Sequence, residues 1–267
     1  MPYLMRGRNE SCVYQETVFR VAATQDWLKA FNRTHPTRAT LFHLVAYATA
    51  LAMQERPRLN RFVSGGRHYQ RREVSLAFVV KTAFRDEAAG ATVKVLAPRG
   101  EPFSEWSGRL AALVDQARTT RRSVDQEVNL IMLLPGFLIR GLVSLARCLD
   151  HWNLYPAFMI RNDPMYSTVF LANLGSVGVS DVYHHLFEYG TTSIFGAVSA
   201  PRPTFFPREN QGVVESGLTV RWTFDERIDD AFSCAGGLYI IRKVTEDPAQ
   251  WLGPPEGAPT WTGQPWT

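Results

Sequence analysis

Residues 129–149 decide first whether this chain folds in water or in a membrane. They read NLIMLLPGFLIRGLVSLARCL, which is almost wholly apolar over about the length that spans a bilayer. Arg140 lies in the middle, where a charge is costly, and Pro135 with Gly136 divides the stretch into pieces typical of buried helices. We therefore predict a pair of helices buried in the protein or at an interface. A contact with one membrane surface through residues 129–149 is the alternative.

The rest of the chain alternates short β-branched runs with helical repeats. Strands are predicted over 13–21, 74–82, 91–97, 167–173, 192–201 and 216–226, and helices over 24–34, 41–55, 104–120 and 233–252. Thr24 and Thr40 are the predicted N-caps of the first two helices. The helix over 41–55, LFHLVAYATALAMQE, should be largely buried, and the last helix is expected to break near Pro248. This mixture favours an α/β or α+β domain.

A β-hairpin is predicted after the second helix, turning at Ser64, Gly65 and Gly66. Six arginines crowd it: Arg56, Arg58, Arg61, Arg67, Arg71 and Arg72. A solvated face is the favoured interpretation, and contact with phosphate or an acidic partner is the alternative.

Charge and cysteine content narrow the class of protein. The 29 basic and 25 acidic residues leave a formal charge of only +4, spread along the chain, which does not favour nucleic-acid binding. Cys12, Cys148 and Cys234 lie far apart without zinc-ligand spacing, so no metal site is expected. Reduced thiols and an N-terminal segment without signal-peptide features predict a cytoplasmic protein.

Several separated stretches, in order, carry a family resemblance: RPRLNRF, VSLAFVV, FLANLGSVG, TSIFGAVSAP, LTVRWTFDERIDDAF and IRKVTEDPAQWL. They resemble the catalytic domain of the dihydrolipoamide acyltransferases of 2-oxo acid dehydrogenase complexes, which share their fold with chloramphenicol acetyltransferase. The resemblance is clearest after Ser167 and weakest over 123–166. It implies an α/β (α+β) fold, a mixed sheet covered by helices. One domain is expected over 1–252, with an apolar helical insert at about 124–160 and a Pro/Gly/Trp-rich tail over 253–267.

The family's catalytic base is replaced in this sequence. The family motif is Asp-His-Arg-x-x-Asp-Gly, and its histidine deprotonates a thiol of dihydrolipoamide or coenzyme A, because imidazole titrates near neutrality. Here residues 225–231 read DERIDDA, so Glu226 stands at the base position, Asp230 keeps the aspartate and Ala231 replaces the glycine. A carboxylate can act as a base when burial makes its charged form costly, which keeps Glu226 as an alternative base.

The family's second catalytic element is also replaced. In a Ser-Asn-Leu-Gly stretch, the family's serine hydroxyl stabilises the tetrahedral oxyanion, and losing such a donor costs a few kcal/mol. This chain has Ala172 followed by the retained Asn173, and alanine cannot donate. Ser176 could replace the missing hydroxyl only if the turn directed its side chain towards the oxyanion position. The two replacements together predict no acyl transfer by the family mechanism.

Two further elements are interpreted as structural. In the family, the aspartate matching Asp230 is chiefly architectural and pairs with an arginine near the first strand, for which Arg6 or Arg8 is the expected partner. The segment HHLFEYG imitates a related histidine motif, but its place in the chain order makes His184 and His185 structural residues.

These inferences favour a catalytically inactive scaffold. The resemblance implies a homotrimer with channels between subunits, and hollow cubic or icosahedral assemblies of trimers. The alternative is a free-standing coenzyme A-dependent acyltransferase with Glu226 as base. No cofactor is predicted, apart from a coenzyme A-like or pantetheine-like ligand that stays open. The tail tryptophans Trp251, Trp261 and Trp266 either anchor in a neighbouring subunit or lie in a disordered tail.

Overall fold

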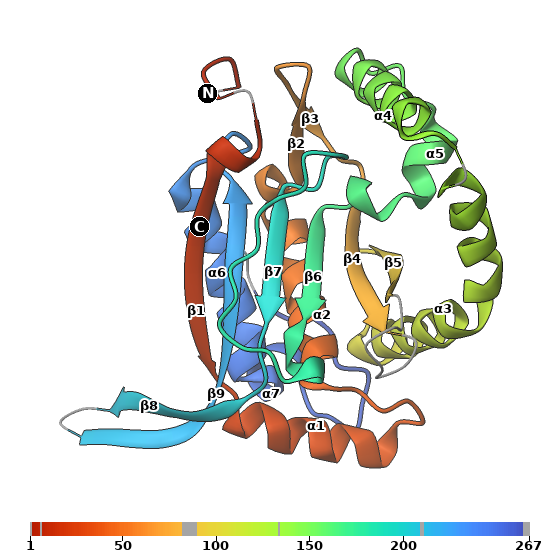
Figure 1. The fold of residues 1–267 in the computed structure, drawn as a ribbon. Helices are drawn as coiled ribbons and strands as arrows, with labels where there is room; N and C mark the ends of the chain where they lie inside the picture. Colours follow the sequence, from red (N-terminus) through yellow and green to blue (C-terminus); the bar gives the residue numbers. More distant parts are fainter. Residues whose placement is uncertain (1, 6, 82–89, 133, 209–210, 264–267) are drawn as a thin grey trace.

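A mixed β-sheet forms the centre of the molecule (Figure 1). This computed structural model describes residues 2–5, 7–81, 90–132, 134–208 and 211–263, with backbone only for 80, 81, 90, 91, 118–132 and 208. The strand order is β1-β9-β7-β6-β4-β5, with β8 paired to β9. Their bounds are β1 Cys12–Arg20, β4 Val74–Lys81, β5 Gly90–Ala97, β6 Val169–Asn173, β7 Ile194–Val198, β8 Arg202–Arg208 and β9 Gln211–Asp225. β4, β6 and β7 run parallel to one another, and the other pairs are antiparallel.

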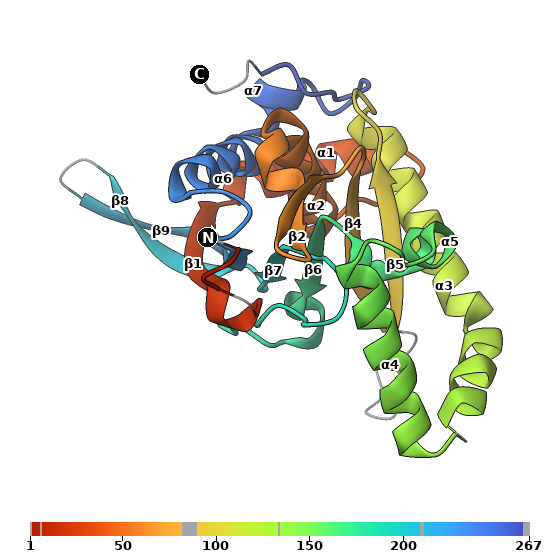
Figure 2. The same cartoon turned by 90° about the horizontal axis from the view of Figure 1, so that it is seen from above.

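Helices cover one face of this sheet, and an irregular segment over 174–193 crosses the other (Figures 1 and 2). The helices are α1 Ala22–Thr34, α2 Leu41–Glu55, α3 Phe103–Met132, α4 Gly136–His151, α5 Ala157–Asn162, α6 Ala231–Glu246 and α7 Pro248–Leu252. A separate hairpin consists of β2 Arg61–Ser64 and β3 Arg67–Gln70. The mixed sheet and its helical layer confirm the predicted fold class.

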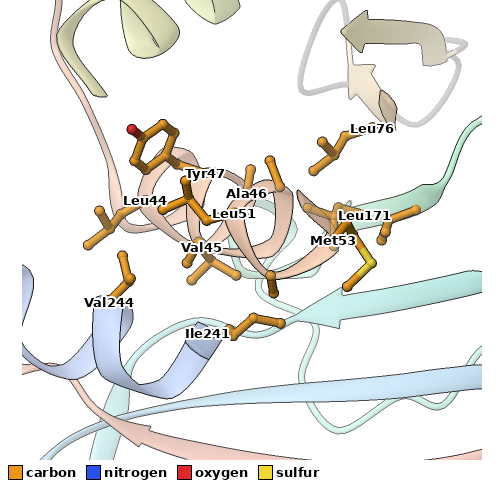
Figure 3. Packing of buried hydrophobic residues seen from close by; sticks show 14 of the residues in the cluster. Leu44, Val45, Ala46, Tyr47, Leu51, Met53, Leu76, Leu171, Ile241 and Val244 are labelled. Atoms are coloured by element: carbon orange, nitrogen blue, oxygen red, sulfur yellow. The ribbon is translucent and has the colours of Figure 1, made fainter. Parts of the chain in front are cut away.

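The main core lies between the sheet and helices α2 and α6. Val45 of α2, Leu76 and Leu171 of the sheet, and Ile241 and Val244 of α6 belong to one cluster of buried residues (Figure 3). Because neighbouring residues of a strand point to opposite faces, the same strands also supply a smaller cluster on the other face. Its members are Ala77, Phe170, Leu186, Phe195 and Ala197. The sheet is therefore covered on both sides.

The helix boundaries test the two predicted caps. The Thr40 side chain accepts a hydrogen bond from the His43 amide and caps α2, as predicted. The prediction for Thr24 is wrong, because α1 already begins at Ala22. The Thr24 hydroxyl is buried inside the fold and donates instead to the carbonyl of Thr245 at the end of α6. A tertiary contact, not a cap, explains this threonine.

The predicted hairpin is present, and a second one was not predicted. Gly65 and Gly66 both have positive φ between β2 and β3, which suits a tight turn. β8 pairs with the extended N-terminal half of β9 and projects from the body (Figure 1). Pro203 and Pro207 interrupt the sequence pattern of β8, and proline is tolerated there because β8 is an edge strand.

The apolar insert is not buried in its own chain. It divides near Pro135 as predicted, but α4 has no buried residue, so the burial part of the prediction is wrong for the described residues, and a place at an interface stays a prediction. The reason is its position, because α4 lies outside the helical layer that covers the sheet (Figure 2). Within the described residues, no helix is long and apolar enough to cross a membrane.

The tail folds back on its own chain. The Phe103 amide donates to the Pro259 carbonyl and the Thr260 amide donates to the Leu252 carbonyl. Trp251 and Trp261 stack with ring centroids 5.8 Å apart. Residues 253–263 thus fold against their own chain instead of forming a disordered tail, and anchoring of the tail tryptophans in a neighbouring subunit stays a prediction. Trp266 lies outside the described residues.

His43 gives the fold a predicted acid sensitivity. Burial lowers the pKa of His43 from 6.5 to about 4, and its Nδ1 accepts from the Thr40 amide. Between these values the unfolded chain binds a proton that the folded chain does not, so stability falls as pH drops from about 6.5 towards about 4. Glutamine keeps the capping partner without titrating. In urea unfolding, His43→Gln should lose roughly 1–2 kcal/mol less than the wild type between pH 7 and pH 4.5. Equal losses would contradict this assignment.

Candidate functional site

A buried ion pair holds the end of β9, where the motif segment 225–231 begins. Arg227 Nε and Nη2 donate to the two carboxylate oxygens of Asp225, each at 2.8 Å, and the Arg227 amide donates to Asp225 Oδ1. Both side chains are almost completely buried. The Asp225 amide donates to the Ser193 carbonyl, and His68 contacts the Arg227 carbonyl. The ends of β9, β7 and the β2–β3 hairpin are thereby held together.

Glu226 lies between these two buried residues with its own side chain exposed. Its backbone amide donates to the Ser11 carbonyl at 3.0 Å, so the main chain at this position is fixed. Burial was the condition under which Glu226 qualified as a general base, and the single chain does not provide it.

The oxyanion position lies on β6. Ala172 is half-buried against the smaller core cluster, and Asn173 ends the strand. The Ser176 hydroxyl donates to the Asn173 carbonyl at 2.7 Å and is exposed at the surface. Ser176 therefore serves its own turn and does not replace the missing hydroxyl at Ala172.

The two replaced positions lie at opposite ends of the sheet within one chain. Ala172 is opposite Ala197 of β7, which is opposite Arg221 of β9. Glu226 is five residues beyond Arg221, which corresponds to roughly 16 Å along the strand. One chain does not bring these two side chains together, so a site that uses both positions needs a second copy.

Asp230 does not pair with Arg8, one of its two predicted partners. Its carboxylate accepts from the Ser233 amide at 3.0 Å and caps α6. Arg8 lies elsewhere, with Nη1 donating to the Phe187 carbonyl at 2.9 Å, and burial lowers its pKa while the charge of Asp225 opposes that shift. Arg6 lies outside the described residues. A helix N-terminus offers Asp230 free amides, which explains why no arginine is needed there.

His184 and His185 pack as predicted for structural residues. The His184 ring stacks on Phe195 with centroids 4.1 Å apart, and His185 stacks on His184 at 4.7 Å. The Thr223 hydroxyl donates to the His184 carbonyl. The pair covers the smaller core cluster, and no group of His, Cys, Asp or Glu among the described residues has the geometry of a metal site.

The arginine-rich hairpin is only partly a solvated face. Arg71 is the exception, because burial lowers its pKa to about 9 and its Nη2 donates to the carbonyl and hydroxyl of Thr191. Its guanidinium also lies 4.4 Å from the Phe62 ring centroid. Arg71 thus joins the hairpin to the body, a role that the sequence pattern does not reveal.

A cavity of about 660 Å³ lies where the N-terminal segment, the β2–β3 hairpin and the end of α4 meet. Charged residues of both signs line it: Arg8, Arg147, Arg227, Asp150 and Glu188. Burial raises the pKa of Asp150, and the charge of Arg8 opposes that shift. Sequence reasoning missed this cavity because its walls come from distant segments. Neither sign of charge dominates its lining, so it resembles a polar junction more than a specific anion site.

Comparison with known proteins identifies the fold. No protein-family model and no curated protein sequence matches the chain. The cubic core of the pyruvate dehydrogenase multienzyme complex matches with a TM-score of 0.63 and 11% identity, over 90% of this chain and 83% of that chain. Azotobacter vinelandii dihydrolipoamide acetyltransferase matches with a TM-score of 0.63 and 12% identity, also over 90% and 83%. Chloramphenicol acetyltransferase matches with a TM-score of 0.51 and 11% identity, over 91% and 92%. At these identities the likeness establishes the fold alone, and it is the fold that the sequence motifs predict.

Proposed function

Starting from this acyltransferase-core fold, we propose that the chain is a catalytically inactive relative of dihydrolipoamide acyltransferase catalytic domains. It acts as a homotrimeric or cage-forming scaffold. One observation carries the proposal: the exposed Glu226 and the hydroxyl-free Ala172 occupy the positions of the base and of the oxyanion donor. Neutral-pH acyl transfer needs a group that takes and returns a proton and a donor for the developing oxyanion. Neither is present at these positions.

The Azotobacter enzyme gives the proposal a point of comparison. Its structural study concerns the catalytic roles of a serine, a histidine and an asparagine, the last two spaced four residues apart. In the motif segment of this chain, Glu226 and Asp230 have the same spacing. The position that keeps a polar residue, Asp230, caps α6. The retained Asp230 therefore supports folding, whereas the replaced positions, Glu226 and Ala172, are those that would have performed the chemistry.

Self-association is supported by the surface of the single chain. Phe205 and Val214 face each other across the projecting β8–β9 hairpin, and each is about two-thirds exposed. Exposed apolar residues on a projecting hairpin are typical of an interface with another subunit. The fold neighbour described as a cubic core is itself an assembly. A trimer or a larger hollow assembly is consistent with both observations.

The mass of the particle tests the scaffold. Light scattering at micromolar concentration should give about three times 30.1 kDa, or a multiple of that trimer mass. Phe205→Glu with Val214→Glu should reduce the mass, because two charges would be buried without partners. The control is Arg202→Gln at the start of β8, which removes an exposed ion pair between Arg202 and Asp181. It should leave the mass unchanged. A wild-type monomer would contradict the scaffold proposal.

The alternative is a free-standing coenzyme A-dependent acyltransferase. The fixed backbone at Glu226 favours it. A neighbouring subunit would have to bury that carboxylate and supply the oxyanion donor. Coenzyme A or a pantetheine-like ligand would then bind between subunits. The minimum requirement is turnover in the wild type that is lost in Glu226→Gln.

A further inference from the structure

Helix α4 is amphipathic: it carries a stripe of leucines and a stripe of polar residues, each with helical spacing. Leu138, Leu142, Leu145 and Leu149 follow the pattern i, i+4, i+7, i+11 and therefore lie on one side of the helix. Arg140, Ser144, Arg147 and His151 follow the same pattern two residues later, and therefore lie on another side. The helix thus separates an apolar side from a polar one.

The C-terminal end of α4 is the part that meets the body of the protein. Arg147, Asp150 and His151 line the 660 Å³ cavity, and the Ser64 hydroxyl donates to the Asp150 carbonyl at 2.8 Å. The leucine stripe is largely exposed, with Leu138 at 44% and Leu142 and Leu145 at 55% each, while Leu149 is half-buried. A surface helix of a globular protein normally turns its apolar side inward. In α4 three of the four stripe leucines are exposed instead, so much of the apolar side is available to something outside the chain.

Exposed aromatic residues lie at both ends of α4. Phe137 at its start is 72% exposed, Trp152 just after its end is 69% exposed, and Phe158 of α5 is 74% exposed. The end of α3 and α4 together form an arm that extends away from the sheet (Figure 2). A flat surface outside the molecule can therefore reach the arm without meeting the body first.

The exposed charges of this region have one sign. Over residues 134–163 the exposed side chains among Lys, Arg, Asp and Glu are Arg140, Arg147 and Arg161. The two acidic residues are turned inward, since Asp150 lines the cavity and Asp163 accepts from the Met165 amide and the Tyr189 hydroxyl. Arginines near exposed leucine and aromatic side chains complement a surface that has an anionic outer layer over an apolar interior.

We propose that α4 and the segment to Phe158 are a membrane-surface element that lies in the interface of a bilayer containing anionic lipids. The leucine stripe and the aromatic side chains enter the boundary between headgroups and acyl chains, and the arginines pair with lipid phosphates. With 16 residues, α4 is about 24 Å long and lies along the surface without crossing it. This goes beyond the proposed scaffold, because it gives the assembly a place to dock.

Vesicle flotation of the full-length protein tests this element. The protein should float with vesicles of phosphatidylcholine and phosphatidylglycerol, and much less with phosphatidylcholine alone. Leu145→Glu should lower the bound fraction at least about tenfold. Ser144→Glu is the matched control, because it adds the same charge one residue away on the polar side, and it should lower binding less than about threefold. Both sites are exposed, so both variants should keep the wild-type melting temperature.

Three results would overturn the proposal. The first is a wild-type protein that does not float with anionic vesicles, and the second is equal loss of binding in the two variants. The third is a fall in particle mass for Leu145→Glu in the absence of vesicles, which would assign the apolar side to a second copy of the chain. Equal flotation with neutral and anionic vesicles would remove the role given to the arginines and would also contradict the proposal.

Discussion

Asp225→Ala is expected to lower the free energy of unfolding by about 3–5 kcal/mol. The substitution leaves the buried guanidinium of Arg227 without the carboxylate that accepts two of its hydrogen bonds. A buried charge that loses its partner keeps the cost of leaving water and loses the compensating attraction. Urea unfolding at a fixed protein concentration measures the loss, since association would otherwise shift the apparent stability.

The neighbouring Glu226 is the control for this substitution. Its side chain is exposed, so Glu226→Ala should change the free energy of unfolding by less than about 0.5 kcal/mol. If the two adjacent substitutions have similar effects, the account of residues 225–231 as a structural segment is wrong. A larger loss for Asp225→Ala than for Glu226→Ala would mean that the motif stabilises the fold through the ion pair between Asp225 and Arg227, and not through the former base position.

Gly175→Ala should cost about 3 kcal/mol. A Cβ atom at Gly175 would lie 2.7 Å from the Ala200 amide nitrogen and 2.7 Å from the Ser199 carbonyl oxygen. Both are backbone atoms next to β7, so relief requires the strand end or the turn to move. The glycine of the former Ser-Asn-Leu-Gly stretch is thus needed for packing whether or not the chain is an enzyme.

Comparing Gly175→Ala with Gly178→Ala, three residues further on, distinguishes the cost of close packing from the cost of backbone strain. Gly178 has φ of +70° with nothing near its Cβ position, so Gly178→Ala should cost only about 1 kcal/mol. Thermal or urea unfolding of the two variants compares them directly. A loss at Gly175 no larger than that at Gly178 would show that the turn adapts easily and that close packing does not fix the glycine.

The fold could be predicted where local pattern and tertiary role agree. Short apolar runs predicted the strands β4, β6 and β7, because strands of a sheet covered on both faces are apolar throughout. The helical spacing of α2 predicted its burial. β8 was missed because its prolines mimic a loop, although an edge strand accepts them. Burial of α4 in the protein or at an interface was predicted from hydropathy with the Pro135–Gly136 break and Arg140, and none of these says which side of a helix faces its own chain.

The candidate site could be predicted in part. Chain order and short motifs located Glu226, Ala172, Asn173 and Asp230, since these depend on sequence alone. The partner of Asp230 could not be found this way, because a helix amide and an arginine both satisfy a carboxylate. The distance between Glu226 and Ala172 could not be predicted either, because it depends on the register of the strands, which the sequence alone does not reveal. The charged cavity at the base of α4 likewise depends on segments far apart in the chain.

The most direct test of the central claim is the release of free coenzyme A from acetyl-coenzyme A with dihydrolipoamide as the acceptor. The wild type and Glu226→Gln are compared, with an active dihydrolipoamide acetyltransferase as the positive control. The account predicts background rates for both proteins, because a proton-transfer group and an oxyanion donor are missing together. Wild-type turnover that disappears in Glu226→Gln would contradict it and would make Glu226 the general base of an enzyme.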